Sequence, residues 1–286
     1  SEYRSMGSGV IVTEKGHIVT NYHVVENAST IEVHLSDGRK AAAKVLGADP
    51  YTDLAIIKID GNGLPAIPVC PNDSIYIGEW AVAIGNPFGA LIRDNQPTVT
   101  VGVVGAVGRE FTRESGIKYT NMIQTDAAIN PGNSGGALVN CLGELIGINT
   151  FIISPGGTGN IGLGFAIPAG RAMKTLKEII QYGKIRSFYT GISIQDINQI
   201  MAHSLGLKSA YGVIVNRLEK NSPGARAGLK VGDIILKVNG KEALDEATIT
   251  DTFNQFLPGD RVTLTVFRDG NEKKIDLLLE SREQQK

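Results

Sequence analysis

The chain has 286 residues, of which 42% are hydrophobic; this is more than one small core needs, so two ordinary globular domains are expected. The 28 basic and 29 acidic residues nearly balance, which excludes the basic footprint of a nucleic-acid-binding protein and a polybasic membrane patch. No run approaches the ~20 apolar residues of a membrane span and no signal peptide opens the chain, so any export signal or anchor is expected to lie outside this sequence.

The two cysteines, Cys70 and Cys141, form no Cys-x-x-Cys pair and have no histidine nearby in sequence, which argues against a zinc site. Buried thiols are the expected state, and a single disulfide between the two cysteines stays open. We expect neither a metal nor a cofactor.

From residue 8 to residue 167 the sequence predicts short β-strands separated by glycine-rich turns. Residues 31–35 alternate between apolar and polar, residues 54–59 and 80–84 are mostly apolar, and residues 98–107 form a β-branched run broken by glycines. This pattern favours paired β-barrels. Stretches rich in glycine and polar residues are expected to form surface loops, the longest being 86–97, 109–118 and 154–162.

Two motifs in the first half offer side chains that could activate a nucleophile. His23 lies at an expected strand end, and Asp53 opens the apolar strand that follows it. Each has a plain structural explanation as well, because His23 could be a satisfied histidine beside two valines and Asp53 could cap its segment. Asp126 is the rival carboxylate, since it is closer in sequence to the candidate nucleophile.

That nucleophile is Ser134, enclosed by glycines in the segment Asn130–Gly136 just after an expected strand end at residues 121–125. Glycines allow a tight turn, so the amides of Gly132 and Ser134 can point at one substrate carbonyl. Such a string alone is most often a turn. The order histidine, aspartate, serine is nevertheless that of chymotrypsin-like proteases, and three coincidences in this order favour catalysis.

After Pro168, apolar residues recur at helical spacing until Gly183, and this helix is expected to end the first domain. We therefore expect one domain over residues 1–183 and another over residues 184–286. The second should contain a strand at 189–194, a helix at about 245–256 and a hairpin that turns at Asp269-Gly270.

These motifs together resemble the HtrA/Deg family of serine proteases with one PDZ domain, most closely its DegS-like branch. The resemblance implies a mostly β protein: a chymotrypsin-like double β-barrel protease domain followed by an α+β PDZ domain. It makes His23 the general base, Asp53 its orienting partner and Ser134 the nucleophile. It also places the oxyanion hole at Gly132, Asn133 and Ser134. The matching segments are Gly7–Ile11, Thr20–Val25, Asp53–Ala55, Ala83–Pro87, Gln124–Ala127, Asn130–Gly136 and Gly164–Pro168.

The same resemblance implies where a substrate would bind. The pocket walls would be apolar, so cleavage should follow small or medium aliphatic residues such as Val, Ala or Ile, and the substrate main chain should pair with Gly164–Ala166. The three expected loops would switch the site between inactive and active arrangements. The implied pocket and strand residues are Ile129, Phe151, Leu163, Gly164, Phe165 and Ala166.

PDZ domains bind a chain's C-terminus as an added strand and hold its carboxylate with backbone amides. By resemblance, Tyr189–Ile192 is the carboxylate loop, and a groove beside it should prefer a hydrophobic C-terminal residue. The same residues would also suit an ordinary core strand. The implied peptide-binding residues are Tyr189, Thr190, Gly191, Ile192, Ile194, Ile249 and Phe253.

The resemblance thus implies an endopeptidase of the bacterial periplasm that cleaves unfolded or regulatory proteins, in stress response and protein quality control, and assembles as a homotrimer. Two departures stand out. Asn133 replaces the aspartate of trypsin-like enzymes. Family members also usually have residues before Gly7–Ile11 that contribute to trimer contacts, and an inner-membrane anchor could precede those residues. The alternatives are a non-catalytic peptide-binding or chaperone-like module, and an esterase that shares the triad.

Overall fold

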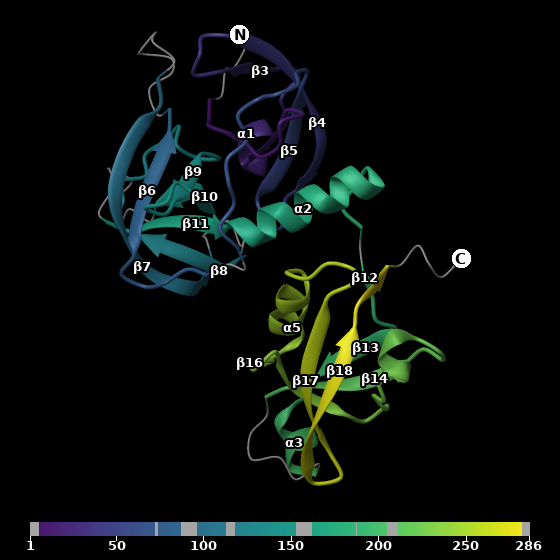
Figure 1. Ribbon diagram of the computed structural model, residues 1–286. Coiled ribbons are helices and arrows are strands. Elements are labelled where there is room, and N and C mark those ends of the chain that lie inside the picture. Colours follow the sequence, from purple (N-terminus) through teal and green to yellow (C-terminus); the bar gives the residue numbers. More distant parts are fainter. Residues whose placement is uncertain are drawn as a thin grey trace. The chain divides into compact units, whose positions relative to one another are not determined.

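The computed structural model describes residues 6–71, 74–86, 96–112, 118–152, 162–186, 188–204 and 211–281. The chain divides into two compact units, residues 1–185 and 186–286 (Figure 1). Most of the expected loops 86–97 and 154–162 lies outside the described residues, as does the side chain of Phe151.

The first half of unit 1 is a five-stranded antiparallel sheet with β1 and β3 at its edges. A short helix, α1 (Tyr22–Val25), follows the second strand, and the central strand is buried along almost all of its length. In sheet order the strands are β1 (Val10–Ile11), β2 (His17–Thr20), β5 (Leu54–Ile59), β4 (Lys40–Asp49) and β3 (Ile31–His34).

The second half of unit 1 is a closed six-stranded barrel. The β7–β8 hairpin extends into residues 109–118, where a loop was expected, because Phe111 packs its ring 5.6 Å from Tyr119 and 4.6 Å from Phe165. In barrel order the strands are β10 (Leu145–Ile152), β11 (Gly164–Pro168), β8 (Lys118–Thr125), β7 (Thr98–Thr112), β6 (Trp80–Gly85) and β9 (Ala137–Val139).

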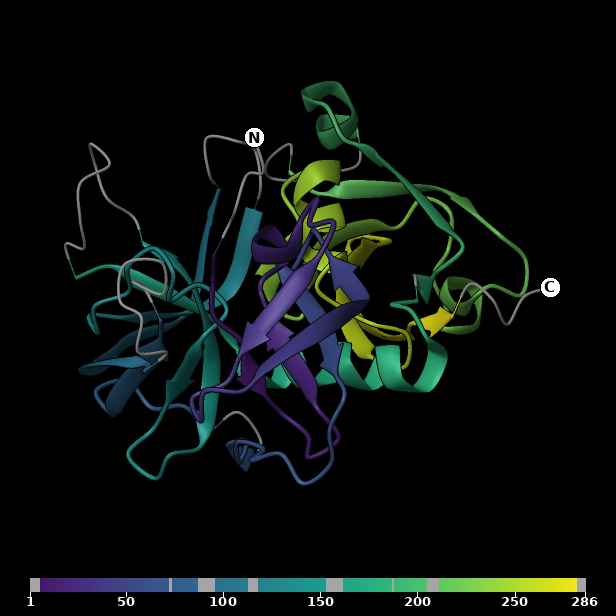
Figure 2. The same ribbon diagram turned by 90° about the horizontal axis from the view of Figure 1, so that it is seen from above.

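The two halves share one hydrophobic core, and they lie side by side in both views (Figures 1 and 2). Leu54 and Ile56 of β5 belong to the same buried cluster as Ile148 of β10. Helix α2 (Ala169–Tyr182) packs on β5, β10 and β11 and ends at Gly183 with φ 70°. The shared core positions the end of β2, the start of β5 and the connection between β8 and β9, and the candidate catalytic residues lie at these three places.

Unit 2 is a six-stranded antiparallel sheet with three short helices, and β13 (Ile192–Asp196) is an edge strand. Helix α5 ends three residues before the expected position. The other strands are β14 (Val213–Leu218), β15 (Ile234–Val238), β16 (Lys241–Glu242), β17 (Arg261–Arg268) and β18 (Asn271–Leu278), with β12 (Phe188–Tyr189) and β19 (Glu280–Ser281) paired separately; the helices are α3 (Gln199–Ser204), α4 (Pro223–Arg226) and α5 (Glu246–Phe253).

The mostly β fold is confirmed, as is the pairing of a barrel-type protease domain with a smaller α+β domain. Cys70 is buried and Cys141 is exposed, and no disulfide joins them. Within the described ranges, no helix has the length and apolar character needed to cross a membrane.

Candidate active site

The Asp53 carboxylate holds the His23 side chain by its Nδ1 atom. Nδ1 lies 2.9 Å from Oδ1 and 2.8 Å from Oδ2, and the His23 backbone N–H donates to Oδ1 at 3.1 Å. Because an ionised carboxylate can only accept, Nδ1 carries the proton and Nε2 keeps its lone pair. Asp53 is 3% exposed, whereas the His23 side chain is 41% exposed, so the pair presents a basic nitrogen at an accessible surface.

Asp53 reaches this position through an unusual backbone conformation. Its φ of 55° is uncommon for any residue but glycine, and it is stabilised because its carbonyl accepts from the Tyr22 N–H at 3.1 Å and from Asn21 Nδ2 at 3.0 Å. Both donors lie in the segment that leads into α1. The end of β2 and the start of β5 therefore lock each other, and the histidine is positioned by the same contacts.

Thr150, which the sequence analysis did not single out, completes the surroundings of this carboxylate. Its Oγ1 donates to Asp53 Oδ2 at 2.9 Å, and its carbonyl accepts the Ser134 hydroxyl at 2.6 Å. Thr150 is fully buried in β10. It thus contacts both the acid–base pair and the candidate nucleophile, which come from different halves of unit 1.

Ser134 lies between β8 and β9, in a turn with a glycine of positive φ on each side of it. The Asn133 N–H donates to the Asn130 carbonyl at 2.9 Å, and Gly132, at the third position of this turn, has φ 99°, as a type II turn requires. Gly135 has φ 84°, and a Cβ there would lie 2.2 Å from the Ser8 carbonyl oxygen. The serine is therefore held at a sharp, close-packed bend.

Of the three residues expected to form the oxyanion hole, Asn133 differs from the other two. Its backbone N–H is already bonded within the turn, so the backbone N–H groups available to a substrate are those of Gly132 and Ser134. The Asn133 side chain is fully buried, and neither polar atom of its carboxamide has a hydrogen-bond partner among the described residues. Asp126, the rival carboxylate, accepts from the Val103 N–H at 2.7 Å.

The expected pocket residues whose side chains the structure describes lie on or beside β11, but the expected substrate-pairing edge is not free. Ile129 is buried, and its Cδ1 would lie 2.9 Å from a Cβ on Gly164, so the two pack closely. Phe165 and Ala166 are buried, and Leu163 is partly buried. Gly164–Ala166 pairs with β8 on one side and β10 on the other, so it offers no free edge to a substrate, contrary to expectation.

A free edge exists instead at the end of β10. Its pairing with β9 stops at Ile148, and Asn149 still exchanges two backbone hydrogen bonds with Gly135 and Gly136. Among the described residues, only 150–152 therefore lack a backbone partner strand on the side opposite β11. Thr150 in this stretch accepts the Ser134 hydroxyl, which places the unpaired edge beside the nucleophile. Sequence reasoning missed this edge because the barrel register that frees it is a long-range property.

In unit 2, the expected carboxylate loop lies at the edge of the sheet. Gly191 has φ 68°, its carbonyl accepts from the Glu219 N–H at 2.9 Å, and the Thr190 carbonyl accepts from Gly224 at 2.9 Å. The Tyr189 hydroxyl donates to Glu219 Oε2 at 2.5 Å. Of the groove residues, Ile192, Ile194 and Phe253 are partly buried against the core, whereas Ile249 is a buried core residue at 1% exposure.

Fold and site together define the class: a trypsin-like serine protease unit joined to a PDZ unit. Residues 7–148 match the family model of the trypsin-like peptidase domain, and residues 189–279 match that of the PDZ domain. The chain is 43% identical over 285 residues to the periplasmic serine endoprotease DegP of Escherichia coli K12, covering 99% of this chain and 58% of DegP. It is 44% identical over 269 residues to a probable DegP-like periplasmic serine endoprotease of Chlamydia trachomatis, covering 94% of this chain and 52% of that protein.

Solved structures of HtrA-type proteases resemble this chain over nearly its whole length. The HtrA-type protease AlgW with a decapeptide matches at a TM-score of 0.70 and 41% identity, covering 97% of this chain and 83% of that one. The serine endoprotease from Yersinia pestis matches at a TM-score of 0.63 and 38% identity, covering 97% and 89%. This chain belongs to the HtrA family of serine proteases, and it spans about half the length of the curated relatives it matches.

Proposed function

We propose that unit 1 is a serine endopeptidase with His23 as general base, Asp53 as the residue that orients it and Ser134 as nucleophile. The carrying observation is the His23–Asp53 pair, in which the buried carboxylate binds Nδ1 through both oxygens and leaves Nε2 basic. The Ser134 turn, on the other half of the same unit, supplies a hydroxyl, which donates to the Thr150 carbonyl. It also supplies the backbone N–H groups of Gly132 and Ser134, which have no backbone partner among the described residues.

Catalysis starts when the Ser134 hydroxyl turns from the Thr150 carbonyl toward His23. Nε2 takes the hydroxyl proton while Oγ attacks the substrate carbonyl carbon, and the resulting oxyanion accepts from the Gly132 and Ser134 amides. The protonated His23 then gives its proton to the leaving amine, and water hydrolyses the acyl-enzyme. Asp53 stays ionised and stabilises the imidazolium.

The substrate main chain would pair with the free edge of β10 at residues 150–152, next to the nucleophile. The apolar side chains of Ile129 and Leu163 near β11 support cleavage after small or medium aliphatic residues. No acidic side chain is among the expected pocket residues to hold a substrate lysine or arginine.

The PDZ unit would bind hydrophobic C-termini through its edge strand. β13 has β14 on one side only, and strand addition needs such an edge. AlgW, the solved relative, is described with a bound decapeptide and a tripeptide. Since the curated relatives are named as periplasmic, we infer a periplasmic location, and the homotrimer, the stress-response role and an inner-membrane anchor stay predictions.

The test is cleavage of an unfolded protein by this chain and by Ser134→Ala, with and without a peptide that ends in a hydrophobic residue. Cleavage that requires Ser134 is expected, and a rise with peptide would indicate regulated proteolysis. Cleavage that the peptide does not alter would indicate quality control with the PDZ unit as a tether. Ester hydrolysis without peptide hydrolysis would favour the esterase, and no hydrolysis at all would favour the non-catalytic module.

A further inference from the structure

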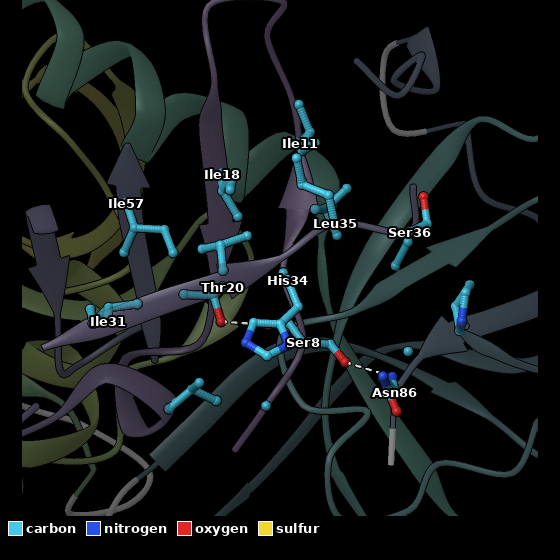
Figure 3. A pocket seen from close by; sticks show the side chains of 18 of the residues that line it. Ser8, Ile11, Ile18, Thr20, Ile31, His34, Leu35, Ser36, Ile57 and Asn86 are labelled. Carbon is cyan, nitrogen blue, oxygen red and sulfur yellow. Dashed lines mark hydrogen bonds between the residues drawn. The ribbon is translucent and has the colours of Figure 1, made fainter. Parts of the chain in front are cut away.

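Ser8, in the segment before β1, contacts both halves of the candidate site with every polar group it has. Its N–H donates to the Ser134 carbonyl at 2.8 Å, and its hydroxyl donates to the Gly132 carbonyl at 2.6 Å. The hydroxyl also accepts from the Asn86 N–H at 2.8 Å, and the Ser8 carbonyl accepts from Thr20 Oγ1 at 2.7 Å (Figure 3).

The hydroxyl bond acts on the peptide group that joins Gly132 to Asn133. The oxygen of that peptide accepts from Ser8, and its N–H donates to the Asn130 carbonyl at 2.9 Å. A peptide plane held at both ends cannot rotate without breaking two hydrogen bonds. The two neighbouring amides, those of Gly132 and Ser134, are the ones that would bind an oxyanion.

The same residue connects this turn to the histidine. Thr20 is buried at 1% exposure and lies three positions before His23, and its hydroxyl bond to Ser8 ties the end of β2 to the nucleophile turn. Glycine at position 8 would supply the same backbone N–H and carbonyl. Only the bonds to Gly132 and Asn86 need the hydroxyl, so the side chain has a role that packing does not require.

We propose that Ser8 is a positioning residue whose hydroxyl fixes the Gly132–Asn133 peptide and so keeps the Gly132 and Ser134 amides in their oxyanion-binding orientation. It also links this orientation to Asn86 at the end of β6. The inference rests on the proposed protease function. It adds a contact, from a residue 124 positions away in sequence, that the His23, Asp53 and Ser134 motifs do not include.

The experiment measures kcat and KM of the full chain for a peptide with an aliphatic residue before the cut. In Ser8→Ala, kcat should fall roughly 10-fold to 100-fold with KM within about 2-fold, because the lost contact matters most in the transition state. Ser8→Thr keeps the hydroxyl at a position that lines a pocket, so it should restore most of kcat.

Thr13→Val is the matched control. The Thr13 hydroxyl, between β1 and β2, lies 2.7 Å from His17 Nδ1 and accepts from the His17 N–H at 3.3 Å. Both contacts are away from the nucleophile turn, so kcat should stay unchanged when they are lost. Melting temperatures of all variants separate positioning from unfolding. The rate at which a fluorophosphonate labels Ser134 gives a second readout of the oxyanion hole, and it should fall in Ser8→Ala in proportion to kcat.

A Ser8→Ala enzyme with wild-type kcat and labelling rate would overturn the proposal. Equal losses in Ser8→Ala and Thr13→Val, or no recovery in a folded Ser8→Thr, would overturn it as well, because these outcomes indicate general destabilisation. If instead the unmodified chain neither cleaves nor labels, the proposed protease function has failed, and that result is separate from any difference among the variants.

Discussion

The two halves of the candidate site are held in different ways. On the first sheet, the Asp53 carboxylate accepts from the His23 ring, the His23 backbone and the Thr150 hydroxyl. On the barrel, the Ser134 hydroxyl is turned to a carbonyl, and the buried Asn133 carboxamide has no partner within the described residues. The acid–base pair is therefore preassembled, and the nucleophile side is where a change must occur before catalysis.

Thr150 lies where the two halves meet, because its side chain serves one and its carbonyl the other. A ligand that pairs with the free edge of β10 would contact the backbone of the same residue. Substrate binding could then free the Ser134 hydroxyl without disturbing the His23–Asp53 pair. The change that precedes catalysis thus takes place on the nucleophile half.

The largest expected effect comes from breaking the preassembled half with Asp53→Asn. The neutral amide can no longer fix the His23 tautomer or stabilise the imidazolium, so kcat should fall on the order of 10⁴-fold. Steady-state cleavage of the aliphatic peptide measures it. Asp126→Asn is the control, since that carboxylate binds Val103 and should leave kcat within a few-fold. Similar losses in both variants would contradict the assignment of Asp53.

Not all residues of the candidate site were equally predictable from sequence. His23, Asp53 and Ser134 stand in local motifs at strand ends, so residue type and order were enough to propose them. Thr150 lies inside the apolar run of β10, and its hydroxyl acts on a residue 97 positions away, so nothing local marks it. The hydroxyl role of Ser8 depends on the same kind of long-range contact.

The fold, too, could be predicted from local sequence but not where it depends on long-range contacts. Alternation and apolar runs predicted the strands, and the Gly183 stop predicted the end of α2. The extra length of β7 and β8 was not predictable, because the strand there is supported by tertiary packing of Phe111 on Tyr119 and Phe165. The substrate edge was placed on β11 instead of β10 because closure of the barrel, which pairs both sides of Gly164–Ala166, does not follow from local sequence.

Removing the contact between the halves should have an intermediate effect. Thr150→Val deletes the hydroxyl bond to Asp53 but keeps the carbonyl that accepts from Ser134. We expect kcat to fall roughly 10-fold, with a loss of about 1 to 3 kcal/mol in stability because Asp53 loses a buried donor. Kinetics and denaturant unfolding measure the two effects. Thr150→Ser should recover both, and a Thr150→Ser enzyme as impaired as Thr150→Val would argue for methyl packing instead.

A smaller effect tests whether the nucleophile half is under-bonded. Asn133→Ala removes a buried side-chain carboxamide that has no hydrogen-bond partner among the described residues, so stability should change by less than about 1 kcal/mol. Asn149→Ala is the control, because Asn149 is equally buried and its Nδ2 donates to the Ala137 carbonyl at 2.8 Å, which predicts a loss of about 1 to 3 kcal/mol. Equal losses in denaturant unfolding would show that Asn133 has a stabilising partner.

The smallest effect should come from His17, which lies on the first sheet away from the site. Burial, with Lys58 and Lys15 nearby, lowers the pKa of His17 from its ordinary value. The unfolded chain then binds a proton more readily than the folded one, so stability should fall as the pH drops through about 6.5. His17→Asn should reduce the difference between melting temperatures at about pH 7.5 and about pH 5.5, and Lys58→Gln should reduce it less. If His17→Asn leaves that difference unchanged, the acid sensitivity of unit 1 has its origin in another group.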